Sequence, residues 1–71
     1  MVNVNKLKGK FTEMGYSTAQ VAKGTGIGLS KLYRRLNNSN EFTVGEADAI
    51  VRFLKLNADE ATSIFFNQFV A

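Results

Sequence analysis

Residues 18–36, TAQVAKGTGIGLSKLYRRL, are the stretch that decides the fold. Apolar residues recur at helical spacing on both sides of a glycine, Gly26, which can adopt the left-handed backbone that a tight turn between helices requires. Ile27 is placed to anchor that turn in the core, and Leu32 and Leu36, four residues apart, form the inner side of the second helix. The pattern predicts a helix-turn-helix, although a helical corner used only for packing has similar requirements.

The outward side of the second helix carries the candidate base-reading residues, Leu29, Ser30, Tyr33 and Arg34. Arg34 can donate two hydrogen bonds to guanine, Leu29 can cover a thymine methyl group, and Ser30 can bond to either kind of base. Tyr33 can also bond a phosphate through its hydroxyl, or pack partly against the preceding helix. The helix is therefore predicted to lie in the major groove of DNA, with surface ion pairing or plain solvation as the alternative for each residue.

Polar and basic residues around this helix are predicted to contact DNA phosphates, which position a protein without reading sequence. They are Gln20, Lys31, Arg35, Asn38 and Asn40. Lysines 6, 8 and 10 can join this surface only if one side of the first helix turns toward the DNA.

The charge of the chain is unevenly distributed along its length. Residues 1–40 carry seven basic side chains and one acidic side chain, whereas residues 41–71 carry two basic and five acidic side chains. A basic half joined to an acidic half favours a polyanionic partner for the basic half, with ordinary solvated charge as the alternative.

The rest of the chain predicts further helices. A helix is expected over residues 5–14, with Gly15 as its left-handed stop and with a second backbone close to Gly9. The helix that precedes Gly26 should begin after Ser17 or Thr18. Chain length allows one domain, residues 1–71, and the expected fold class is all-α, a compact five-helix bundle containing the helix-turn-helix of a DNA-binding domain.

The second half of the chain contains two helix-start signals. Thr43 and Glu46 have the spacing of a capping box, and residues 57–60 (NADE) form a similar signal. Between them and the preceding helix, residues 37–40 are expected to be a polar loop, with at most a brief strand over residues 41–43 and with Phe42 in the core.

The residue types that the chain lacks exclude several classes of protein. The chain has no histidine and no cysteine, and its six acids show no paired spacing, so we predict no catalytic residues, no metal site, no cofactor and no enzyme activity. No apolar run approaches the roughly 20 residues that cross a membrane, and the first residues do not resemble a signal peptide. A cytoplasmic location and no membrane partner are therefore expected.

The motif and its flanks resemble a known family. Tyr16-Ser17, Gly26-Ile27 and residues 32–37 (LYRRLN), together with residues 7–16 and 64–66, are similar to the XRE family of phage repressor and Cro-type regulators, in particular to small regulators of temperate phages of Gram-positive bacteria. The resemblance covers nearly the whole chain. It implies binding to operator DNA and a role in transcription regulation as a repressor or Cro-like protein.

The chain departs from the family pattern at two phosphate-contacting positions. The family often has Gln at the first position of the helix that precedes the turn, where this chain has Thr18. The contact to the DNA phosphate backbone is therefore assigned to Thr18 or Gln20. The family often has Ser at the start of the recognition helix, where this chain has Gly28, and the amide at that position is predicted to face a phosphate.

Aromatic residues near the C-terminus exceed what one helix face needs. Phe66 and Phe69, with Val70, are predicted to form an interface, although they can also fold back onto the first helix. One short recognition helix contacts few base pairs, so a homodimer is expected. A small interface gives weak association in free solution, so the alternatives are a dimer in solution and a dimer that forms only on DNA. The alternative function is a protein-interaction module that docks on another regulator such as a phage repressor.

Overall fold

The computed structural model describes residues 2–39 and 42–69, with side chains described for 2–37 and 42–65. In these residues, all regular secondary structure is helical. The elements, in order, are α1 (Val4–Glu13), α2 (Thr18–Thr25), α3 (Leu29–Arg34), the π-helical segment η1 (Arg35–Ser39), α4 (Val44–Leu54) and α5 (Ala58–Phe69). The all-α prediction is confirmed. No strand occurs in the described ranges, which include residues 42 and 43, where the sequence allowed at most a brief one. None of the described helices is long and apolar enough to span a bilayer.

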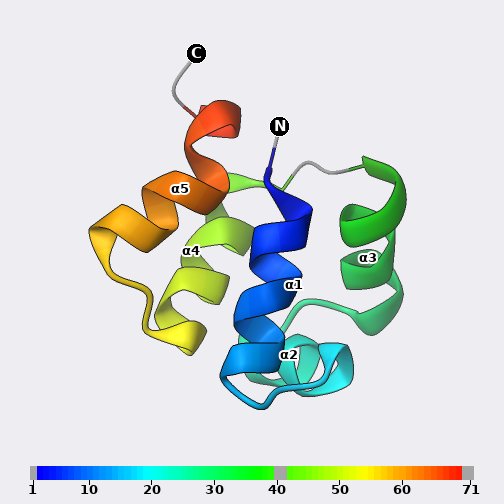
Figure 1. Ribbon diagram of the computed structural model, residues 1–71. Helices are drawn as coiled ribbons and strands as arrows, with labels where there is room; N and C mark the ends of the chain where they lie inside the picture. The colour runs from blue at the N-terminus through cyan, green and yellow to red at the C-terminus, as the bar shows by residue number, and fades with distance from the viewer. Residues whose placement is uncertain (1, 40–41, 70–71) are drawn as a thin grey trace.

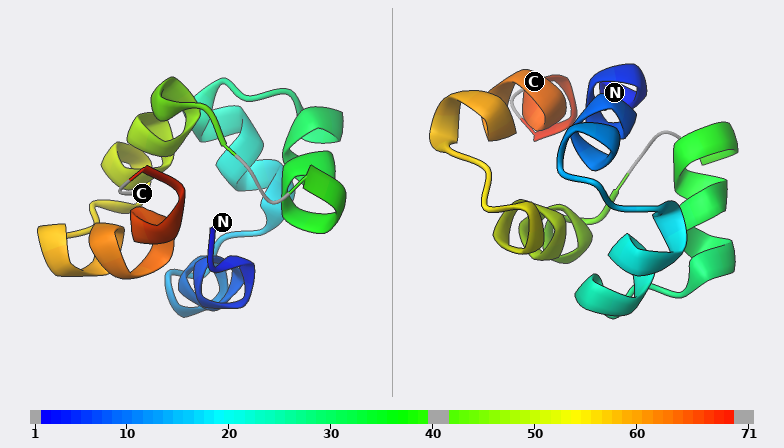
Figure 2. Two further views of the ribbon diagram at one scale, coloured as in Figure 1. Left: turned by 90° about the horizontal axis from the view of Figure 1, so that it is seen from above. Right: turned by 60° about the horizontal axis from the view of Figure 1, so that its bottom comes forward.

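The helices are arranged so that α2 packs against both α3 and α4, while α5 packs against α1 and α4. In Figures 1 and 2, α3 and α5 lie on opposite sides of the molecule, and α1 lies between them in the view of Figure 1. The radius of gyration is 10.8 Å, close to the roughly 11 Å of a compact chain of this length. Because α3 and α5 lie on opposite sides of the molecule, α5 does not cover the outer side of α3.

One hydrophobic core joins the helices, and its members come from every α-helix. Leu7, Val21, Leu32, Ile50 and Leu54 are among its fully buried side chains. Beside them, the rings of Phe42 and Phe65 meet edge to face with centroids 5.9 Å apart, which confirms the prediction that Phe42 is in the core. The core thus ties the start of α4 to α5 independently of the α2–α3 turn.

Asn3 caps α1 through one hydrogen bond, and reciprocal side-chain caps define three further helix starts. Ser17, one of the two candidates from the sequence, caps α2: its hydroxyl accepts from the Gln20 amide at 3.1 Å, and Gln20 Oε1 accepts from the Ser17 amide at 2.7 Å. Thr43 and Glu46 form the predicted capping box of α4. The third signal, residues 57–60, is confirmed by two reciprocal bonds of 3.0 and 2.8 Å. These caps satisfy amides that have no partner inside a helix.

Two local predictions were wrong. No atom lies within 4 Å of the position that a Cβ on Gly9 would occupy, because Gly9 lies on an exposed part of α1 rather than against another backbone. Residues 37–39 are the end of η1 rather than a loop, since their backbone continues α3 with the wider hydrogen-bond spacing of a π-helix. Residue 40 lies outside the described ranges. The left-handed backbones predicted at Gly15 and Gly26 are confirmed, with φ of 78° and 77°.

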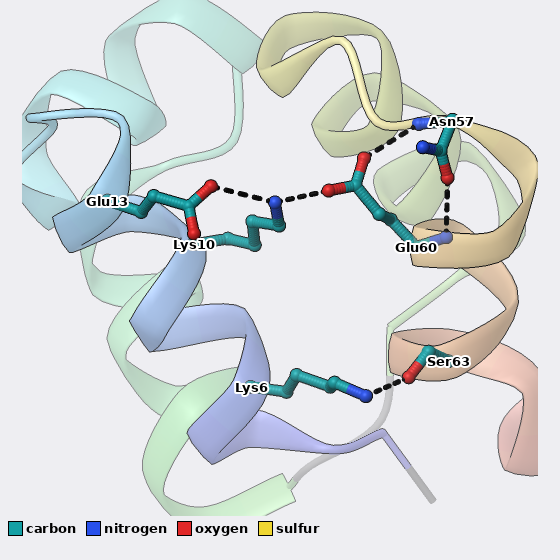
Figure 3. A network of polar contacts seen from close by, with 6 residues as sticks. All are labelled: Lys6, Lys10, Glu13, Asn57, Glu60 and Ser63. Carbon is teal, nitrogen blue, oxygen red and sulfur yellow. Dashed lines mark hydrogen bonds and ion pairs between the residues drawn. The ribbon is translucent and has the colours of Figure 1, made fainter.

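A polar network joins α1 to α5 (Figure 3). Lys6 Nζ donates to Ser63 Oγ, and Lys10 Nζ makes ion pairs with Glu13, at 2.9 Å, and with Glu60 of α5. Lys6 and Lys10 are four residues apart, so both lie on the side of α1 that faces α5. This network uses two of the three lysines of α1 at a distance from α3.

The network makes stability depend on pH. The hydrogen bond with Lys10 lowers the pKa of Glu60, and the hydrogen bonds to Glu60 and Glu13 raise the pKa of Lys10. Ionised Glu60 therefore stabilises the fold above its ordinary pKa, and that contribution is lost as pH falls through its lower folded value. The contribution of charged Lys10 is complete below its ordinary pKa and is lost as pH rises through its raised folded value.

We expect Glu60→Gln to lower the free energy of unfolding near neutral pH, and the difference from the wild type to be smaller near pH 3, because protonation of the wild-type carboxylate increases as the pH falls. Urea unfolding at both pH values measures this difference. Asp59→Asn is the control, because it removes one charge beside Glu60 and leaves the Lys10 ion pair intact. A Glu60→Gln difference that is equal at the two pH values would contradict the assignment.

Candidate nucleic-acid interface

The turn between α2 and α3 is held by one glycine and one threonine. Gly26 ends α2 in the left-handed conformation, and its amide donates to Ala22 O. Thr25 Oγ1 donates to Val21 O at 2.7 Å and accepts from the amide of Ile27 at 3.4 Å, while Ile27 is buried. Thr25 was not singled out in the sequence, although a hydroxyl in the last turn of a helix, next to a glycine, is a usable signal. These contacts set the direction in which α3 leaves the turn.

The side of α3 opposite the core is open to solvent. Leu32 and Leu36 are buried, as predicted, whereas the candidate base-reading residues are all exposed, Leu29 at 42% and Tyr33 at 48%. Partial burial of Tyr33 against the preceding helix, the alternative for this residue, is thus limited to about half of its surface. The structure places the four side chains on one outward face, and their contact with bases stays a prediction.

A groove of about 390 Å³ runs beside α3, between the end of α1, the start of α2 and η1. Thr18 and Tyr33 line it, and so do Thr12, Asn37 and Lys8. The groove therefore combines hydroxyl and amide groups, one cation and the N-terminal end of α2, which favours anions. Phe11, Tyr16 and Leu36 also line the groove, so its polar groups lie beside an apolar wall.

Lys8 lines the groove but was not among the predicted phosphate-contacting residues. It lies four residues before Thr12, which lines the same groove, whereas Lys6 and Lys10 share the side of α1 that faces α5. The helical period would have separated these two sets of lysines, but it could not have shown which set faces α3. That choice depends on how α1 is rotated in the bundle.

The other predicted phosphate-contacting residues are in different situations. Gln20 is exposed, with its side-chain oxygen bonded in the α2 cap, and Gly28 and Lys31 are exposed at the start and on the outer side of α3. Arg35 is half-buried and forms an ion pair with Glu46. The side chain of Asn38 and the whole of Asn40 lie outside the described residues.

Three cations without an ion pair lie near α3. Within residues 2–37 and 42–65, Lys8, Lys31 and Arg34 form no ion pair, while Lys10, Arg35 and Arg52 are each paired with an acid. Lys8 lines the groove, and Lys31 and Arg34 belong to the exposed face of α3; Lys23 of α2 and Lys55 at the end of α4 are also without an ion pair in these ranges. The surface around α3 therefore carries three of the unpaired cations, and it is defined here as the α3 surface: Lys8, Thr18, Leu29, Ser30, Lys31, Tyr33 and Arg34.

No family model, curated protein or solved structure matches this chain. The α3 surface is therefore interpreted from its own geometry and chemistry.

The predicted interface residues Phe66 and Phe69 belong to the last turn of α5, but their side chains, and all of Val70, lie outside the described residues. In the described part of the chain, potential metal ligands do not gather in groups of three or more.

Proposed function

We propose that the protein is a sequence-specific DNA-binding regulator of transcription, in which α2, the turn at Gly26 and α3 form a helix-turn-helix. The observation that carries this proposal is the division of α3 and its continuation η1 into two sides, with Leu32 and Leu36 buried and Leu29, Ser30, Tyr33 and Arg34 exposed. A helix fits into the major groove, where each base pair presents a distinct set of donors and acceptors. A side chain reads that set only if the protein itself leaves it free.

The groove beside α3 supports the same proposal. When α3 enters the major groove, a helix end next to it meets the sugar–phosphate backbone. The start of α2, with Thr18, Lys8 and the hydroxyl of Tyr33 around it, offers hydrogen-bond donors and a positive charge at that place. Contacts to phosphate would then set the register in which Arg34 meets its base.

Twofold pairing completes the proposal. A helix of six residues, Leu29–Arg34, covers few base pairs, so two copies on half-sites about 34 Å apart would give the affinity that one copy lacks. Operator binding of this kind agrees with the resemblance to repressor and Cro-type regulators. A binding role of this kind requires no catalytic group and no cofactor.

Arg34 provides the test. Wild-type protein is used to select duplexes from a randomised pool, and its affinity is measured for the enriched duplex and for a scrambled duplex of equal length. Arg34→Ala is expected to lose about 1–3 kcal/mol of binding free energy on the enriched duplex and little on the scrambled one, because two bonds to guanine are removed. Lys31→Ala is the matched control, since loss of a phosphate contact weakens binding to both duplexes about equally.

Failure has two recognisable forms. If Arg34→Ala lowers the two affinities in proportion, Arg34 contacts phosphate and does not read a base. If the wild-type protein enriches no duplex at all, the DNA-binding proposal is wrong, and docking on another protein becomes the function to pursue.

A further inference from the structure

The two adjacent arginines at the end of α3 have different surroundings. Arg34 is exposed, whereas the next residue, Arg35, points into the molecule, with its side chain 24% exposed and its Nε atom buried. That Nε lies 3.2 Å from Oε1 of Glu46, in the first turn of α4, which is ion-pair distance, although the N–H is not aligned for a hydrogen bond. Arg35 is thus tied to another helix at the point where α3 passes into η1.

The carboxylate of Glu46 interacts with two groups. Its Oε1 accepts from the amide of Thr43 at 2.8 Å, as part of the α4 cap, and forms the ion pair with Arg35. Burial of this side chain, which is 12% exposed, raises its pKa, but the Thr43 amide and the positive charge of Arg35 lower it further, so that its pKa lies below the ordinary value. Glu46 is therefore ionised near neutral pH, and its charge is balanced by Arg35.

We infer that Arg35 and Glu46 form a positioning pair that orients α3 for DNA reading, a role that rests on the proposed function. The α3 helix packs on α2, and its beginning is held by the turn at Gly26. The ion pair holds its other end against the start of α4. That start is itself fixed by its cap, and Ala47 and Ile50 bury the same helix in the core.

Arg34 is the residue that loss of this ion pair would affect most. It is bonded directly to Arg35, so any rotation or tilt at the end of α3 is carried into its long side chain. Two hydrogen bonds to one base tolerate little displacement, whereas a phosphate contact by a flexible cation tolerates more. Loss of the pair should therefore reduce discrimination between sequences more than it reduces binding as such.

Two substitutions with opposite effects on charge separate positioning from simple attraction to phosphate. Arg35→Met lowers the net charge by one, and Glu46→Gln raises it by one. Gln keeps an oxygen that can accept from the Thr43 amide, so the α4 cap is preserved. If the pair positions α3, each variant is expected to lower the ratio of affinities for the enriched and scrambled duplexes about tenfold.

The controls come from the same helix. Asp48 and Arg52 form an exposed ion pair on α4, so Asp48→Asn and Arg52→Met make the same charge changes without touching Arg35. Both are expected to leave the ratio unchanged. The double variant Arg35→Met with Glu46→Gln, which restores the net charge, should be no worse than either single variant, because the two residues act as a unit. Circular dichroism at the binding temperature verifies that each variant is folded.

The outcomes are distinct. A lower ratio in both single variants, with unchanged controls, supports the inference. Equal weakening on both duplexes by Arg35→Met, with equal or tighter binding by Glu46→Gln, means that Arg35 contacts phosphate and overturns it. A lower melting temperature with an unchanged ratio means that the pair only stabilises the fold, and also overturns it. If the wild type itself does not discriminate between the duplexes, the proposed function fails first and the positioning role fails with it.

Discussion

Binding to duplex DNA is expected to weaken roughly a thousandfold between about 50 and 200 mM monovalent salt. Each phosphate that a cation neutralises releases condensed counterions, and the logarithm of affinity then falls with the logarithm of salt concentration by about 0.9 per phosphate. Lys8, Lys31 and Arg34 are free of ion pairs among the described side chains, so the proposed dimer brings about six such cations to the DNA. Affinity measured on one duplex across a salt series gives the slope.

Two lysines of the same helix make this prediction specific. Lys8→Gln should reduce the slope by about one for each copy bound, because Lys8 lines the groove beside α3. Lys6→Gln removes an equal charge only two residues away, but Lys6 is bonded to Ser63 of α5, so its slope should match the wild type. Equal effects of the two substitutions would show that the groove is not a phosphate site. An affinity that does not change with salt would show that DNA is not the ligand.

Alanine at position 24 is expected to lower the free energy of unfolding by about 1–3 kcal/mol. A Cβ on Gly24 would overlap the ring of Phe53 from α4, which packs directly on the backbone of α2. That ring also packs on Tyr16, with centroids 4.8 Å apart, so a shift of Phe53 disturbs a second contact. Chemical denaturation followed by circular dichroism measures the change.

Gly9→Ala is the matched control, because it makes the same substitution inside a helix where no neighbour lies within 4 Å. It is expected to raise the free energy of unfolding by about 0.5–1 kcal/mol, since alanine favours the helix and restricts the unfolded chain. The two variants should therefore differ in sign. In a Phe53→Ala background the cost of Gly24→Ala should disappear. If that cost persists without the ring, close packing against Phe53 is not its cause.

Local features of this fold could be predicted because each depends on residues a few positions apart. The caps of α2, α4 and α5 join residues three apart, and the inward placement of Leu32 and Leu36 follows from a spacing of four. The left-handed turn at Gly26 needs only a glycine at the end of a helix. Such signals depend only on residues that are close in the sequence, and not on what the helices pack against.

Contacts between distant residues could not be predicted in the same way. Which lysines of α1 face α3, which side chain covers Gly24 and which acid meets Arg35 all depend on how whole helices are rotated and packed. The same period that marks the inner side of a helix leaves its outer positions equivalent until a neighbouring helix is in place. Packing in three dimensions removed that equivalence, turning Lys6 and Lys10 toward α5, Lys8 toward the groove and Arg35 away from the outer side of α3.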